Sequence, residues 1–133
     1  MITTRVHGIL DYIIGIALIA APWIFGFANS GPETWVPVIL GAGSILYSLI
    51  TDYELGLAGI LSMKSHLRTD IVVGLVLAVS PWIFGFANVV WAPHLIVGLV
   101  ILGVSMSTHA VPSKTAAAPE DTGHHHHPTF GRR

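Results

Sequence analysis

Four stretches of apolar residues follow one another along the chain, each bounded by polar or turn-forming residues. They run from about residue 6 to 27, from 36 to 50, from 71 to 86 and from 93 to 106. A bilayer core about 30 Å thick needs roughly 20 helical residues to cross it. The pattern therefore predicts four transmembrane helices, of which the second and fourth are short and rely on tilt or on local adjustment of the bilayer.

The first apolar stretch has a competing interpretation as a secretory signal peptide. Arg5 precedes it, and the small residues Ala20 and Ala21 resemble a cleavage site. Asp11 interrupts the apolar run, however, and bulky residues follow the small ones. A signal peptide has an uninterrupted apolar region, so we expect a membrane span instead.

Composition supports an all-α membrane protein. The 133 residues include only six basic and seven acidic side chains, and 53% are hydrophobic, whereas charged residues make up about a quarter of a typical soluble domain. The absence of cysteine excludes thiol chemistry and cysteine-ligated metals. The absence of basic runs argues against binding to nucleic acid. No nucleophile–base pair or phosphate loop is visible, so we expect neither an enzyme nor a cofactor.

The six basic residues predict the orientation of the helices. They precede the first span, lie between the second and third, or follow the fourth, at Arg5, Lys64, Arg68, Lys114, Arg132 and Arg133. Short loops rich in Lys and Arg stay in the cytoplasm. We therefore expect a multi-pass protein of the cell (inner) membrane with both termini cytoplasmic, and with residues 28 to 35 and 87 to 92 outside.

An internal repeat relates the two halves of the chain. The eight residues from Pro22 to Asn29 recur, unchanged, from Pro81 to Asn88, at an offset of 59 residues. His7 and Asp11 recur as His66 and Asp70 at the same offset. Each repeat spans two helices, so both copies enter the membrane from the same side and form two tandem, parallel-repeat hairpins.

Ser80-Pro81-Trp82 and its counterpart Ala21-Pro22-Trp23 resemble the motif of the SPW-repeat integral membrane proteins of bacteria. The resemblance covers about residues 5 to 109. It implies two-helix repeats in a membrane, and it implies no established reaction or ligand. Ala21 stands where the motif has serine, so a function of the serine hydroxyl cannot be required in both halves.

The repeat and the shifts in composition divide the chain into four parts. Residues 1 to 53 form the first hairpin, and residues 66 to 110 form the second. The apolar segment between them, residues 54 to 65, is too short to span the bilayer, and we expect a cytoplasmic linker at the membrane interface. Residues 111 to 133 are rich in Ser, Thr, Ala, Pro and charge, which predicts a disordered tail.

Pro22 and Pro81 each remove a backbone hydrogen bond, so both should kink or end their helices near the outer leaflet. The tryptophans that follow would act as anchors at the interface. Two alternatives stay open. The prolines could free the carbonyls of Leu18 and Leu77 to bind an ion or a polar ligand, or the Ser80 hydroxyl could bond to a carbonyl of its own helix.

Polar side chains gather near the cytoplasmic ends of the predicted helices. The pairs His7/Asp11 and His66/Asp70 each lie four residues apart, on one helix face. Burial of an unpaired ionisable group costs about 2.5–3.5 kcal/mol at the bilayer centre, so we expect interfacial positions and local ion pairing, for example with Arg5 and Arg68. The pseudo-symmetry predicts one ring of six polar residues, namely His7, Asp11, Asp52, His66, Asp70 and His109.

Metal binding receives limited support from the sequence. The types in the polar ring could ligate a metal, but no HExxH or Glu-x-x-His pattern orders them. The tail run His124, His125, His126 and His127 could hold a divalent ion loosely. We expect His94, which follows Pro93 on the outer side, to be an interfacial or core histidine.

We therefore expect a small non-enzymatic membrane protein with a structural or interaction role. Its partners would be the lipid bilayer and a second copy of the chain or another membrane protein. The rival hypothesis is a minimal transporter or proton-coupled channel that uses Asp11 and Asp70. Transport requires both carboxylates to face a common polar cavity, whereas a structural role does not.

Overall fold

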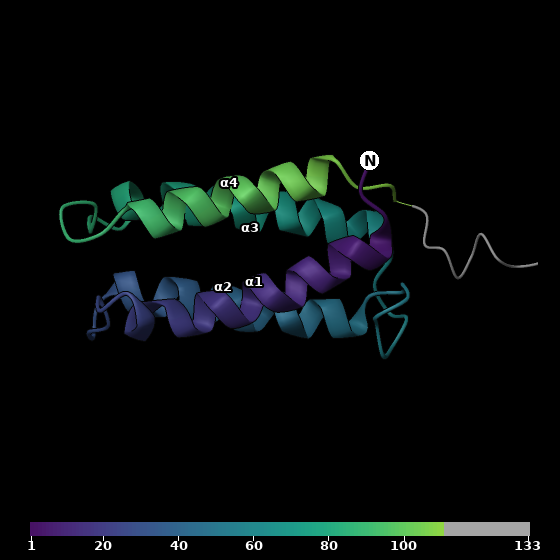
Figure 1. The fold of residues 1–133 in the computed structure, drawn as a ribbon, viewed down its shortest axis with the longest axis horizontal. Coiled ribbons are helices and arrows are strands. Elements are labelled where there is room, and N and C mark those ends of the chain that lie inside the picture. The colour runs from purple at the N-terminus through teal and green to yellow at the C-terminus, as the bar shows by residue number, and fades with distance from the viewer. Residues whose placement is uncertain (111–133) are drawn as a thin grey trace, which may run out of the picture.

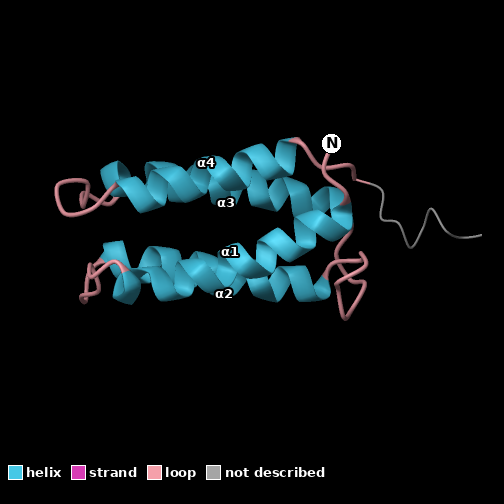
Figure 2. Ribbon diagram, in the orientation of Figure 1, coloured by secondary structure: helices cyan, strands magenta, loops and turns pink. Residues whose placement is uncertain are grey.

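Four helices form two antiparallel hairpins in the computed structural model, which describes residues 1–110. Helix α1 (Thr4–Ile24) pairs with α2 (Pro32–Ile50), and α3 (Met63–Ile83) pairs with α4 (Ala92–Met106). Figure 1 shows the hairpins lying side by side as two layers. Outside the helices the described chain forms turns and loops (Figure 2) and two isolated bridges. The predicted all-α fold of four helices is confirmed.

Helices α1 and α3 are built in the same way. Each has 21 residues and begins after a hydroxyl residue, Thr3 or Ser62, whose side chain accepts a hydrogen bond from a backbone N–H of the first turn. Such N-caps satisfy donors that the helix itself leaves free. Each helix ends two residues after its proline, and a glycine with φ of 73° follows, at Gly26 or Gly85. The prediction that the prolines lie at the helix ends is confirmed.

The helix bounds differ from the expected spans in three places. Helix α3 begins at Met63, eight residues before the expected start, because the Ser62 cap allows the polar residues 63–70 to be helical. Helix α2 begins at Pro32, where proline suits the first turn of a helix. Helix α1 ends at Ile24, before the apolar run is over. The linker between the hairpins is consequently residues 51–62, with Leu57 and Ile60 exposed.

Each hairpin is closed by a contact between two glycines. A Cβ atom added to Gly41 would lie 2.6 Å from the Gly15 carbonyl oxygen, and one added to Gly98 would lie 2.6 Å from that of Gly74. Small residues allow helices to approach closely in lipid, where packing drives association. The hairpins meet around a small apolar core to which every helix contributes one fully packed side chain, namely Leu18, Val36, Leu77 and Ile101.

The outward faces of the helices are apolar. Isoleucine, leucine and valine side chains on all four helices are exposed, Ile16 and Leu46 among them. Helices α1, α2 and α3 are long and apolar enough to cross a membrane, whereas α4 has 15 residues. A water-soluble protein rarely exposes contiguous apolar surface on this scale. The surface is that of a protein that lies in lipid.

Candidate functional site

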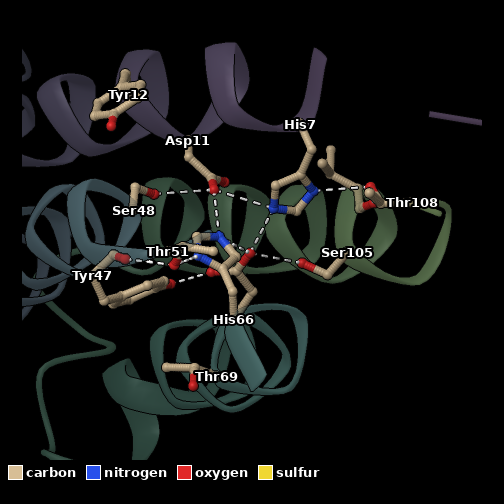
Figure 3. A network of polar contacts seen from close by, with 12 residues as sticks. His7, Asp11, Tyr12, Tyr47, Ser48, Thr51, His66, Thr69, Ser105 and Thr108 are labelled. Atoms are coloured by element: carbon tan, nitrogen blue, oxygen red, sulfur yellow. Dashed lines mark hydrogen bonds and ion pairs between the residues drawn. The ribbon is translucent and has the colours of Figure 1, made fainter. Parts of the chain in front are cut away.

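The first turns of α1 and α3 carry the same polar side chains at the same helical positions. Histidine is the fourth residue of each helix, at His7 and His66, and aspartate is the eighth, at Asp11 and Asp70. All four side chains lie at the end of the bundle that holds the N-terminus and the linker, and Figure 3 shows that they converge between the hairpins.

Each histidine makes its shortest ion pair with the aspartate of the other hairpin. His7 Nε2 lies 2.7 Å from Asp70 Oδ2, and His66 Nε2 lies 2.7 Å from Asp11 Oδ2. The contacts within one helix, four residues apart, are longer, at 3.1 Å in α1 and 3.3 Å in α3. The two hairpins are therefore joined by a reciprocal exchange of histidine–aspartate pairs.

Two threonines hold the other nitrogen of each histidine ring. His66 Nδ1 lies 2.8 Å from Thr51 Oγ1, and His7 Nδ1 lies 2.9 Å from Thr108 Oγ1. Each threonine hydroxyl donates its proton to the carbonyl four residues back, of Tyr47 or Val104, at 2.6 Å. A hydroxyl has one proton, so it must accept from the histidine.

This arrangement fixes the protonation of the imidazole rings. Both Nδ1 atoms carry a hydrogen, because their threonine partners can only accept. Each Nε2 atom then either carries a second proton, which makes the ring cationic, or accepts one from the carboxyl group. Each histidine–aspartate pair across the hairpins therefore shares one proton along its 2.7 Å contact.

Further hydroxyl groups surround the carboxylates. Ser48 Oγ donates to Asp11 Oδ2 at 3.3 Å, and Ser105 Oγ donates to Asp70 Oδ2 at 3.4 Å. The Tyr47 hydroxyl donates to the second oxygen of Asp70. Val104 stands at the position in α4 that corresponds to Tyr47, so this last bond breaks the symmetry of the cluster.

The cluster is buried. His7 and His66 have no exposed surface, Asp70 is 2% exposed, and the Asp11 side chain is 11% exposed. Burial of charged groups is costly unless they are paired and hydrogen-bonded. The expectation of ion pairing with nearby arginines does not describe this site. In residues 1–110 both carboxylates pair with the two histidines, and Arg5 and Arg68 are exposed.

The structure does not bring all six predicted ring residues together. Asp52 and His109 are exposed, one residue beyond the threonines that contact the histidines. Asp52 lies against Gly59 in the linker, and the backbone N–H of His109 donates to the Ile2 carbonyl. The chain leaves the helical conformation at Thr51, where ψ is 140°, so the next side chain turns away from the bundle.

Sequence reasoning missed Thr51, Thr108 and the serine partners. A signal was present, because Ser48 and Thr51 have the same spacing as Ser105 and Thr108, at an offset of 57 residues. The repeat was followed only as far as the glycines of the second helices. Continuing it to the helix ends would have identified all four hydroxyl residues.

Four potential metal ligands meet in the cluster. One ligand atom from each of His7, Asp11, His66 and Asp70 can be chosen so that all four lie within 4.8 Å of one another. These ligands come from two hairpins, so no local sequence motif announces them. The other metal candidates of the sequence, His124, His125, His126 and His127, lie outside the described residues.

The repeat motif lies at the opposite end of the bundle. Pro22 and Pro81 are buried, whereas Trp23 and Trp82 are more than half exposed, which suits interfacial anchors. The Ser80 hydroxyl donates to the Leu77 carbonyl at 2.7 Å, so the carbonyl beside Pro81 is occupied within its own helix.

An apolar cavity of about 210 Å³ also lies at that end, between α1, α2 and α4. His94 lines it, is 1% exposed, and has its Nε2 atom 3.1 Å from the Glu33 carbonyl oxygen. His94 is thus a core histidine, one of the two expected possibilities. A second apolar cavity lies between α2 and α3. No residue of the His–Asp cluster lines either of these two cavities.

The sequence was compared with known families and proteins. The family model described as the SPW repeat domain matches residues 5–108, nearly the whole described chain. The chain belongs to the SPW repeat family. Searches of curated proteins and of solved structures gave no match. Membership of the SPW repeat family and the apolar helices together identify a membrane protein, and the family assigns no reaction to the His–Asp cluster.

Proposed function

We propose that this SPW repeat protein is a small, non-enzymatic protein of the bacterial cell (inner) membrane, with a structural or interaction role. The observation that carries the proposal is the reciprocal pairing of His7 with Asp70 and of His66 with Asp11. The pairs lock two hairpins that otherwise meet through a small apolar core. In lipid, where apolar contacts between helices gain little over contacts with lipid, such polar pairs specify which helices associate.

The experiment removes one partner at a time. Asp11→Asn and Asp70→Asn should each lower the free energy of unfolding in detergent by about 3–5 kcal/mol, because each leaves a buried histidine without its charged partner. Asp52→Asn is the matched control, since Asp52 is exposed. Equal stability of all three variants would refute the structural role.

We further propose an origin by internal duplication. The N-caps, the His and Asp positions, the terminal prolines and the glycine contacts all correspond between α1–α2 and α3–α4. The isolated bridges also correspond, because Ile2 and Leu61 differ by the offset of the first helices, and Thr51 and Thr108 by that of the second. A pseudo-two-fold axis along the membrane normal accounts for this agreement.

The proposed orientation places both termini and the linker in the cytoplasm. Arg5, Lys64 and Arg68 are all exposed and belong to the helix starts at the end shared by the N-terminus and the linker (Figure 1). A reporter that is active only in the periplasm should be active when fused near Ser30 and inactive near Ser62. The reverse pattern would overturn the orientation.

The proposed partners are the lipid bilayer, against the exposed apolar faces, and a second copy of the chain or another membrane protein. Nucleic acid is not among them, because the basic residues are few and dispersed. Chemical crosslinking in native membranes distinguishes the two protein partners, since a second copy gives a product of twice the mass.

The burial of four titratable groups favours one second candidate, a minimal transporter or proton-coupled channel. Transport needs a polar path to the carboxylates, whereas the two cavities described above are apolar and have other linings. The geometry therefore favours the structural role. Replacement of both Asp11 and Asp70 by Asn should abolish any proton-linked flux into reconstituted vesicles if transport is the function, and unchanged flux would exclude it.

A further inference from the structure

We propose that His7, Asp11, His66 and Asp70 form a four-coordinate site for a divalent transition-metal ion, and that Zn²⁺ is the ion whose chemistry fits. The inference rests on the proposed function, because a metal ion bound here would clamp the same two hairpins. It adds a ligand that neither the sequence motifs nor the family assign.

The ligand atoms already lie close to the separations that a tetrahedral ion requires. The two Nε2 atoms and the two Oδ2 atoms are 2.7, 2.7, 3.1 and 3.3 Å apart in the four histidine–aspartate contacts. Zinc bonds to histidine and aspartate of about 2.0–2.2 Å place neighbouring ligand atoms roughly 3.3–3.5 Å apart in a tetrahedron. An expansion of less than about 1 Å would admit the ion, without any change of helix register.

The surroundings of the ligands are those of a metal site. A ligating histidine usually donates its second N–H to an oxygen, which fixes its tautomer and the direction of the ring. Thr51 and Thr108 accept from Nδ1 of His66 and His7, and this leaves both Nε2 atoms directed at the centre of the cluster. Ser48 and Ser105 hold the carboxylates in the same way. Every ligand therefore has a supporting hydroxyl group.

Charge selects the class of ion. Two neutral imidazoles and two carboxylates carry a charge of −2, so a divalent cation makes the buried site neutral, whereas a monovalent ion leaves it charged. Neutrality is a strong requirement where the dielectric constant is low. Two nitrogen donors favour zinc and similar transition metals over Mg²⁺ and Ca²⁺, which prefer oxygen alone.

The metal ion takes the place of two protons. The metal-free cluster shares one proton in each histidine–aspartate pair, as the threonine contacts require, and is also neutral. The competing possibility is that the two protons alone occupy the cluster at all times. The test below separates the two.

The probe is Co²⁺ alone, followed by Zn²⁺, added to the full-length protein in detergent after removal of metals with a chelator. His124, His125, His126 and His127 are replaced by Ala in every sample, because the tail run would bind these ions too. We expect about one equivalent of Co²⁺, intense visible absorption typical of tetrahedral coordination, and loss of the spectrum when Zn²⁺ displaces it. A folded protein that binds no Co²⁺ and no Zn²⁺ would overturn the inference.

Variants locate the site. The double variant Asp11→Asn, Asp70→Asn should bind at least about 100-fold more weakly, and the double variant Asp52→Asn, His109→Asn should bind as the parent does, because these two residues are exposed. The pair Thr51→Val, Thr108→Val keeps all four ligands and should weaken binding by about 10–100-fold. Equal binding by the parent and the Asp11, Asp70 variant would place the metal elsewhere and overturn the inference.

The two proposals fail in different ways. If the parent binds no metal but Asp11→Asn and Asp70→Asn still destabilise the fold, the metal site is wrong and the structural role stands. If neither substitution changes stability, the structural role is wrong, and the metal inference that rests on it falls as well.

Discussion

His7 and Asp70 lie 2.7 Å apart, Nε2 to Oδ2, although 63 residues separate them in the chain. Asp11, one turn from His7 on the same helix, lies farther from that nitrogen, at 3.1 Å. The shorter contact joins the two hairpins, and its mirror image joins His66 to Asp11. Because the bond crosses between repeats, it stabilises the arrangement of the hairpins and not only a single helix.

The threonine hydroxyl groups should contribute measurably to stability. Thr51→Val and Thr108→Val each leave a buried histidine N–H without an acceptor, which costs about 1–3 kcal/mol. Unfolding in detergent measures the loss. Thr69→Val is the matched control, because the Thr69 hydroxyl donates only to the Ser65 carbonyl of its own helix and lies away from the histidines in Figure 3. A loss as large in Thr69→Val would contradict the role given to the other two threonines.

The glycine contacts should be equally selective. Gly41→Ala and Gly98→Ala force a methyl group to within 2.6 Å of a facing backbone carbonyl, which we expect to destabilise the hairpins by about 1–3 kcal/mol. Gly43 and Gly103 lie on the same two helices with no atom within 4 Å of an added methyl group. Alanine at those positions should be neutral or stabilising by up to about 1 kcal/mol. Thermal unfolding of the four variants provides the comparison, and a uniform effect would argue against the packing described.

Ser80 offers a test of the motif itself. Ser80→Ala removes the bond to the Leu77 carbonyl and should cost about 0.5–1.5 kcal/mol, while the fold is retained. The first repeat has Ala21 at this position and forms the same helix end. Circular dichroism of the variant should therefore show unchanged helix content. A loss of helix would mean that the serine holds the helix end in a way that Ala21 does not need.

Local patterns in the sequence predicted the helices well and the site only in part. Apolar length identified four helices, and proline and glycine identified where α1 and α3 end. The spacing of His7 and Asp11 correctly placed them on one helix face. Spacing says nothing about the rotation of one hairpin against another, so the shorter cross-hairpin partners could not be found in this way.

Two errors have physical causes that the sequence hides. The start of α3 was predicted too late because residues 63–70 are polar, yet they are helical where His66 and Asp70 enter the cluster. Asp52 and His109 were placed in the ring because they follow the helix ends. The turn of the backbone after Thr51 and Thr108 instead directs the threonines to the histidines and leaves the next side chains exposed.

The central claim is that the hairpins are joined by histidine–aspartate pairs across the repeats, and a double-mutant cycle measures it most directly. His7→Asn, Asp70→Asn and the double variant are unfolded in detergent beside the parent, with a second cycle between His7 and Asp52. Coupling between contacting residues amounts to about 0.5–3 kcal/mol, whereas distant residues are additive. We expect coupling above about 1 kcal/mol for His7 with Asp70 and none for His7 with Asp52. Additive effects of His7→Asn and Asp70→Asn would contradict the account.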